Sequence, residues 1–228
     1  MKITSTFSVA GRCSLTGALG VIVTSSSPSV GARCPWVKTG VGAILTQNVT
    51  DPRLADIGFS VLENGYDAQS AIRSMKETSP FPEYRQIAVI DGKGNSASFT
   101  GNQALGVHGE FHDKNVVSIG NLLSDSSIPE AMGRTFLQTE GEPLTERLIR
   151  AMEKGFEMGG ELDQEHSIAL LIHTDDPFAY ADLRVDYSDH PLEDLKKLWE
   201  IYAPQANDYK VRAVTPDFAP SYGVKGDE

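Results

Sequence analysis

A threonine close to the amino end is the side chain best placed for nucleophilic chemistry. Thr6 opens the segment Thr6-Phe7-Ser8-Val9-Ala10, in which Phe7 and Val9 alternate with smaller residues as a β-strand requires. When a threonine is the first residue of a mature chain, its free α-amine has a pKa of ~7.7–8.0 and can accept the hydroxyl proton near neutral pH. The hydroxyl oxygen can then attack an amide carbonyl. Five residues precede Thr6, so this chemistry requires cleavage between Ser5 and Thr6. Without cleavage, Thr6 is an ordinary β-branched strand residue.

Four other side chains are candidates for binding a substrate or stabilising an oxyanion. Arg33 and Lys38 flank a short loop, where a cation could lower the pKa of a nucleophile or hold a substrate carboxylate. Asn48 at a strand end, and Asn121 beside Gly120, could donate hydrogen bonds to an oxyanion. Each also has a structural interpretation, as a solvated cation or as a residue of a turn or strand end. The sequence leaves both interpretations open.

Cysteine and histidine chemistry at the same cleft is a weaker alternative. Two cysteines, Cys13 and Cys34, are too few for a disulfide framework, and we expect both to be packing residues. His108 and His112 are four residues apart, but Gly109 favours a loop rather than a zinc-binding helix. We therefore expect no metal site. No glycine-rich phosphate loop is recognisable, so we expect no cofactor.

Composition limits the kinds of partner. The 228 residues include 31 acidic and 20 basic side chains, which give a formal net charge of -11. Such a surface argues against nucleic acids, because phosphate contacts need clustered Lys and Arg, and it argues against anionic membranes. The sequence contains no run of ~18 apolar residues, which a helix needs to cross a bilayer. The start of the chain is too short and polar for a signal peptide, so we expect a cytoplasmic protein whose ligand is a small-molecule amide or a peptide.

The order of the elements predicts how these residues are positioned. Helical spacing begins near residues 54, 67, 129, 143 and 191, so the helices come in pairs between groups of strands. Paired helices disfavour a doubly wound parallel sheet and favour two antiparallel sheets with helices outside them. We expect one domain over residues 1–205 and an irregular C-terminal arm over residues 206–228. Exposed sheet edges and this arm make a homodimer reasonable. The expected strands cover residues 6–10, 19–23, 40–48, 85–90, 96–100, 116–121, 167–172 and 181–186.

Several short motifs, taken in their order and spacing, resemble one family. They are Thr6-Phe7-Ser8-Val9-Ala10, Gly31-Ala32-Arg33-Cys34-Pro35-Trp36, Gly40-Val41-Gly42-Ala43, Phe99-Thr100-Gly101, Gly120-Asn121-Leu122-Leu123, Ser167-Ile168-Ala169-Leu170-Leu171, Asp182-Leu183-Arg184-Val185-Asp186 and His190-Pro191. Together they resemble the bacterial and archaeal domain-of-unknown-function 1028 family, from about Thr6 to Tyr202. That family is placed in the N-terminal-nucleophile hydrolase superfamily. The resemblance implies an α+β fold, a four-layer α-β-β-α sandwich of two antiparallel sheets, with Thr6 as the nucleophile.

Two functions follow from the resemblance and the residues together. The leading hypothesis is an amidohydrolase that acts on a small amide or peptide through Thr6 after processing. The alternative is a non-catalytic binding or assembly protein that keeps the fold with an unprocessed N-terminus. The family has no established activity, so fold membership alone does not decide between them.

Overall fold

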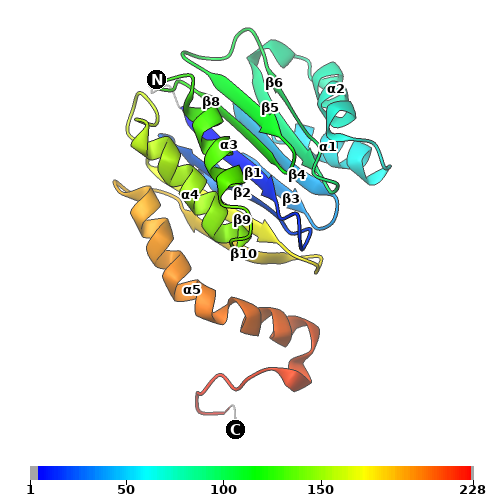
Figure 1. Cartoon of the computed structure of the whole chain (residues 1–228), viewed down its shortest axis with the longest axis vertical. Coiled ribbons are helices and arrows are strands. Elements are labelled where there is room, and N and C mark those ends of the chain that lie inside the picture. The colour runs from blue at the N-terminus through cyan, green and yellow to red at the C-terminus, as the bar shows by residue number, and fades with distance from the viewer. Residues whose placement is uncertain (1–4, 227–228) are drawn as a thin grey trace.

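Two antiparallel sheets form the centre of the protein in the computed structural model, which describes residues 5–226 (Figure 1). The larger sheet has six strands in the order β10-β9-β2-β1-β8-β7, and the smaller has four in the order β3-β4-β5-β6. The strands of the larger sheet are β1 (Thr6–Arg12), β2 (Leu19–Ser25), β7 (Gly109–Asp113), β8 (Val116–Asn121), β9 (Ser167–His173) and β10 (Ala179–Val185). Those of the smaller sheet are β3 (Pro35–Lys38), β4 (Gly42–Asn48), β5 (Arg85–Asp91) and β6 (Ser96–Thr100).

Helices cover the outer face of each sheet. The helices α3 (Ile128–Gln138) and α4 (Leu144–Glu157) pack on β1, β2 and β8, and α5 (Pro191–Val214) packs on β9 and β10. The helices α1 (Arg53–Glu63) and α2 (Ala68–Thr78) pack on the smaller sheet. The predicted four-layer sandwich of two antiparallel sheets is thereby confirmed. Within residues 5–226, no helix is long and apolar enough to cross a membrane.

Apolar side chains fill the three spaces between these layers. Phe7 and Phe136 belong to the core under α3 and α4, while Ile44 and Met75 belong to the core under α1 and α2. The core between the sheets contains small and branched residues: Ala10, Leu19, Val21, Ala43, Leu45, Ala88, Ile90, Val117 and Ile119. The small residues among them let the two sheets approach closely, which brings side chains of β4 and β5 against β1.

Strand register places the beginning of β1 in the middle of the larger sheet. Thr6 is opposite Ser25 of β2 on one side and Asn121 of β8 on the other. Since β1 runs antiparallel to both neighbours, their carboxyl ends meet at its amino end. Polar residues that are far apart in the sequence therefore converge on Thr6.

Three elements differ from the sequence-based expectations. The helix expected from residue 191 continues to Val214 with Pro204 inside it, so the prediction of an irregular arm over residues 206–228 is wrong as far as Val214. The helical pattern fades there because this end of α5 extends away from the sandwich and buries few apolar residues (Figure 1). Strand β3 was not expected, and His112 lies in strand β7 instead of a loop. A homodimer stays a prediction.

Candidate functional site

The Thr6 hydroxyl lies directly against the peptide group that precedes it. Thr6 is 5 % exposed, and its Oγ1 donates a hydrogen bond to the carbonyl oxygen of Ser5 at 2.6 Å. Its second partner is the Oγ of Ser25, at 3.3 Å. The Thr6 nitrogen is an amide here, bonded to Ser5, and an amide nitrogen has no basic lone pair. In this form the residue can attack its own preceding carbonyl but cannot use its amine as a base.

A row of hydroxyl groups connects this carbonyl to a cation. The Ser25 hydroxyl donates to the Ser5 carbonyl oxygen at 2.5 Å and lies 2.7 Å from the Oγ of Ser27. Arg33 Nη2 in turn donates to the Ser27 Oγ. The Ser5 carbonyl oxygen therefore accepts two hydroxyl hydrogen bonds, from Thr6 and from Ser25. This is the kind of arrangement that stabilises negative charge on a carbonyl oxygen during acyl transfer.

Three amide side chains, here called the amide brace, hold the other side of Thr6. They are Gln47, Gln86 and Asn121. Gln47 Nε2 donates to the Thr6 carbonyl oxygen at 3.2 Å and to Gln86 Oε1 at 2.8 Å. Asn121 Nδ2 donates to the same two oxygens, at 3.3 and 3.2 Å, and Gln86 Nε2 donates to the Gly120 carbonyl oxygen at 2.9 Å. The brace links the two sheets through polar contacts that are fully buried, where hydrogen bonds are strongest.

Two of the four predicted binding residues reach the neighbourhood of Thr6. Asn121 contacts Thr6, although its amide bonds the Thr6 carbonyl and not the Ser5 carbonyl, which is where an oxyanion would form. Arg33 is connected through Ser27, and its Nη1 also binds the carbonyl oxygens of the adjacent turn.

The other two predicted residues lie elsewhere. Asn48 Nδ2 donates to the carbonyl oxygen of Tyr84, and its Oδ1 accepts from the Leu105 nitrogen, so its amide fixes a loop. Lys38 forms an ion pair with Glu63 at the end of α1. Lys38 pairs with the first residue of β4 and Gln47 is near the last, so the length of β4 separates Lys38 from Thr6.

Two buried acidic side chains lie on the side of Thr6 where Ser5 is, and they were not expected from the sequence. Glu161 follows α4 and is 6 % exposed, and its Oε2 accepts from the Ser26 nitrogen at 2.9 Å. Glu165 Oε1 accepts from the Glu161 nitrogen at 2.9 Å. Burial raises the pKa of Glu161 to about 8, because ionisation there loses hydration, and contacts with Ser5 and Ser26 only partly oppose this. Burial also raises the pKa of Glu165.

Local backbone geometry explains how Glu161 reaches this position. Gly159 and Gly160 have φ values of 104° and 56°, which favour glycine, and they turn the chain back after α4. A β-carbon on Gly160 would lie 2.1 Å from Glu165 Oε1. Two consecutive glycines before an acidic residue were the visible signal, but nothing in the sequence relates them to Ser5.

Neither cysteine lies at this site. Burial raises the pKa of Cys34 to about 12, so its thiol stays protonated at neutral pH. Cys13 follows the far end of β1, where Arg12 is opposite Leu19. Among residues 5–226, no group of three or more His, Cys, Asp or Glu side chains could hold a metal ion.

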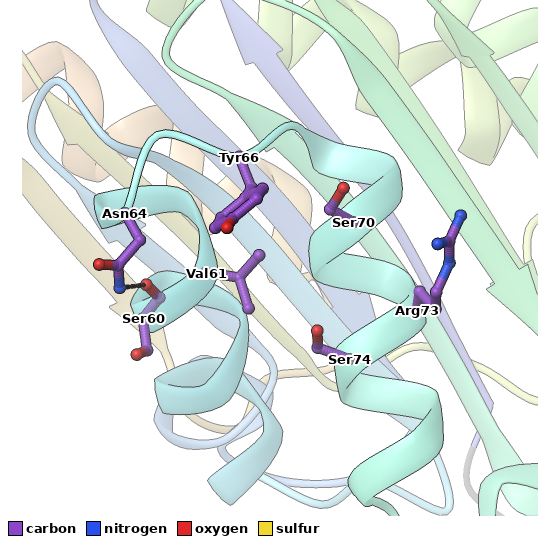
Figure 2. A pocket seen from close by; sticks show the side chains of 7 residues that line it. All are labelled: Ser60, Val61, Asn64, Tyr66, Ser70, Arg73 and Ser74. Carbon is purple, nitrogen blue, oxygen red and sulfur yellow. Dashed lines mark hydrogen bonds between the residues drawn. The ribbon is translucent and has the colours of Figure 1, made fainter.

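A surface pocket of about 290 Å³ lies between α1 and α2 (Figure 2). Both helices cover the outer face of the smaller sheet, whereas the amide brace lies on its inner face, so the sheet separates this pocket from Thr6. Arg73 points away from α1, and Asn64 Nδ2 is bonded to the Ser60 carbonyl oxygen at 2.7 Å. The pocket is lined by Ser60, Val61, Asn64, Tyr66, Ser70, Arg73 and Ser74.

Comparison with known proteins identifies the family of this chain and a similar solved structure of the same family. The sequence model described as "Family of unknown function (DUF1028)" matches residues 6–195. The crystal structure of protein SPO2555 from Silicibacter pomeroyi, of the same family, superposes with a TM-score of 0.80 at 25 % identity, covering 87 % of this chain and 89 % of that one. No functionally curated protein is similar in sequence.

More distant structures share only the general arrangement. Anbu (ancestral beta-subunit) from Yersinia bercovieri gives a TM-score of 0.42 at 13 % identity, over 92 % of this chain and 98 % of that one. An Anbu (Gly-1) mutant from Hyphomicrobium gives 0.40 at 11 % identity, over 89 % and 96 %. Similarity at this level is too weak to support an inference about function.

Proposed function

The chain belongs to the DUF1028 family, and from the geometry around Thr6 we propose that it is an amidohydrolase of the N-terminal-nucleophile type. It would act on a small amide or peptide through Thr6, after the bond between Ser5 and Thr6 has been broken. The observation that carries this proposal is the contact of Thr6 Oγ1 with the Ser5 carbonyl group at 2.6 Å, with Ser25 donating to the same oxygen.

The first step is the release of Thr6 from the residues before it. Thr6 Oγ1 attacks the carbonyl carbon of Ser5, and the electron pair of the C=O bond moves to the oxygen, which Ser25 stabilises. The C–N bond then breaks, and the hydroxyl proton ends on the Thr6 nitrogen, leaving an ester. Water hydrolyses the ester to a Ser5 carboxylate and a free Thr6 hydroxyl. The net reaction is hydrolysis of one peptide bond.

The released α-amine gives Thr6 the base that it lacks in the uncleaved chain. Near neutral pH the amine accepts the hydroxyl proton as the oxygen attacks the substrate amide. The amide brace holds the Thr6 backbone while this happens, since Gln47 and Asn121 both bind its carbonyl oxygen. Arg33, acting through Ser27, adds positive potential to the hydroxyl row.

Intact-mass measurement of the freshly purified protein tests the release. We expect the mass of a chain that begins at Thr6, and the Thr6→Ala protein should keep the residues before position 6. Amine release from a panel of small amides and dipeptides should then depend on the cleaved form. A full-length mass that persists while hydrolytic activity is present would refute the Thr6 mechanism.

The burial of Ser5 favours a second candidate function. Ser5 is 1 % exposed and hydrogen-bonded, as expected if the chain simply continues through this position. A binding or assembly protein with an uncleaved N-terminus would show this arrangement. It predicts a full-length mass and no loss of function in Thr6→Ala, so the same two measurements separate the alternatives.

A further inference from the structure

Ser5 is almost fully buried, and its neighbours form specific hydrogen bonds with it. The Ser5 nitrogen donates to Ser26 Oγ at 3.1 Å, and the Ser5 hydroxyl lies 3.3 Å from the same oxygen. Its carbonyl oxygen accepts from Thr6 and Ser25. Every polar group of Ser5 therefore has a partner, while only 1 % of the residue is exposed.

Glu161 is a neighbour of Ser5 whose carboxyl group is only partly hydrogen-bonded in the described part of the chain. One carboxyl oxygen, Oε2, accepts from the Ser26 nitrogen at 2.9 Å, and the side chain also contacts the Ser5 hydroxyl. The other oxygen, Oε1, is buried and has no hydrogen-bond partner among residues 5–226. A buried polar atom without a partner is costly, which points to a group that binds there at some stage. The acidic group that faces Glu161 is Glu165, and Glu165 in turn faces His166.

We propose that Ser26 and Glu161 form the subsite for the acyl side of the substrate, with Ser5 as its first occupant. This inference rests on the proposed function, because a nucleophile that cleaves two bonds from one position needs both carbonyl groups in the same place. A substrate carbonyl must replace that of Ser5, next to Thr6 and Ser25. The rest of its acyl residue then lies where the remainder of Ser5 now lies.

The contacts of Ser5 define the substrate class. Ser26 Oγ accepts the N–H on the α-carbon, so the acyl group is an amino-acid residue. Ser5 is almost fully buried, so we expect this position to favour a small side chain. Glu161 interacts with the Ser5 hydroxyl, so we expect its carboxyl to favour a hydroxyl on that side chain. The substrate expected from these contacts is an amide of a small hydroxylated residue, such as a seryl peptide, and leucyl-sized residues should be disfavoured.

The uncleaved chain carries its own test substrate, so residue 5 can be varied in the full-length protein. We would compare Ser5 with Ser5→Ala and Ser5→Leu, each combined with Glu161, Glu161→Gln or Glu161→Leu. Cell-free synthesis followed by intact mass at timed intervals gives the release rate. Thr6→Ala is the uncleavable control, and the melting temperature of each chain reports folding.

Selectivity, not the absolute rate, identifies a subsite. In chains that keep Glu161, we expect the bond between residues 5 and 6 to be cleaved at least ~10-fold more slowly in Ser5→Ala and in Ser5→Leu than in the chain with Ser5. The reason is that a site that binds a hydroxyl disfavours the analogue that lacks it. Glu161→Gln keeps a hydrogen-bonding group and should keep the serine preference. Glu161→Leu should reduce the Ser5 to Ser5→Ala ratio to within about threefold.

The possible results separate the two proposals. If Glu161→Leu slows both chains equally and leaves the ratio unchanged, Glu161 is only structural and the subsite is refuted while the Thr6 mechanism stands. If no chain is cleaved, including the one with Ser5 and Glu161, the Thr6 mechanism is refuted and the subsite falls with it. Loss of the serine preference only in Glu161→Leu supports both.

Discussion

Replacing Glu161 with glutamine should stabilise the protein, and the gain should grow with pH. The side chain is almost fully buried, and burial raises its pKa from an ordinary 4.5 to about 8. Between these two values the unfolded chain carries an ionised Glu161 while the folded chain holds it protonated. Raising the pH through this window therefore favours unfolding. Glutamine has a similar shape and does not ionise, so the variant escapes this loss.

The pKa difference sets the size of the effect. Each pH unit above 4.5 costs about 1.4 kcal/mol of unfolding free energy for such a group. At pH 7 the loss is about 3 kcal/mol, and above pH 8 it levels off near about 5 kcal/mol. A loss of about 3 kcal/mol is a large share of the roughly 5–15 kcal/mol by which a folded domain is typically stabilised.

Urea unfolding of the Thr6→Ala protein at pH 4, 7 and 9 measures this effect without interference from cleavage. Glu161→Gln should match its parent at pH 4 and exceed it progressively at pH 7 and 9. Glu157→Gln is the matched control, because it removes one carboxyl group from a side chain on α4 that is 65 % exposed instead of buried. A Glu161→Gln protein that is equally or less stable at pH 9 would refute the argument.

Three further predictions follow from other contacts. Ser25→Ala removes a donor to the Ser5 carbonyl oxygen and should slow the release of Thr6 by about 10²-fold, as measured by timed intact mass. Gly160→Ala should lower the unfolding free energy, measured by urea unfolding, by about 1 kcal/mol or more, because φ is 56° and the new β-carbon would collide with Glu165. An unfolding free energy equal to that of the wild type would contradict this. In the native protein, iodoacetamide should label Cys13 before Cys34. Burial raises the pKa of Cys34 to about 12, whereas at Cys13 hydrogen bonds from the adjacent turn outweigh burial and lower the pKa. Equal labelling rates would contradict this prediction.

The sequence was sufficient to predict the general architecture. The alternating residues after Thr6 predict a strand. The paired helices between groups of strands predict two antiparallel sheets with helices outside them. These signals are local, because they depend on the side-chain periods of strands and helices. The start of α2, expected near residue 67, also depends on a local signal, because the Asp67 side chain accepts a hydrogen bond from the Ser70 nitrogen at 2.8 Å.

The composition of the site depends on strand pairing, which the sequence does not show. Gln47 and Gln86 are opposite each other on β4 and β5. Gln47 reaches Thr6 of β1 and Gln86 reaches Gly120 of β8 only because the two sheets are stacked. Asn48 was a candidate for its amide group, but side chains on a strand alternate between faces, and its neighbour Gln47 is the residue that faces inward. Glu161 could not be placed because its contact with Ser26 spans 135 positions of the sequence.

The positions of the two candidate cations, Arg33 and Lys38, likewise depend on a strand that the sequence does not show. Arg33 and Lys38 are close in sequence, yet Arg33 precedes β3 and Lys38 is its last residue, so the strand separates them along its length. Arg33 reaches the Ser27 hydroxyl, whereas Lys38 reaches Glu63. Because β3 was not expected from the sequence, nothing in the residue pattern separates the two cations.

The amide brace separates two parts of the site that respond differently to acidity. Gln47, Gln86 and Asn121 have no titratable proton, so the backbone of Thr6 is held in the same way in acid and in alkali. Glu161 and Glu165, on the other side of the Ser5–Thr6 bond, do titrate. A change in pH therefore changes the charge on the Ser5 side of this bond, while Gln47 and Asn121 hold the Thr6 carbonyl oxygen in the same position.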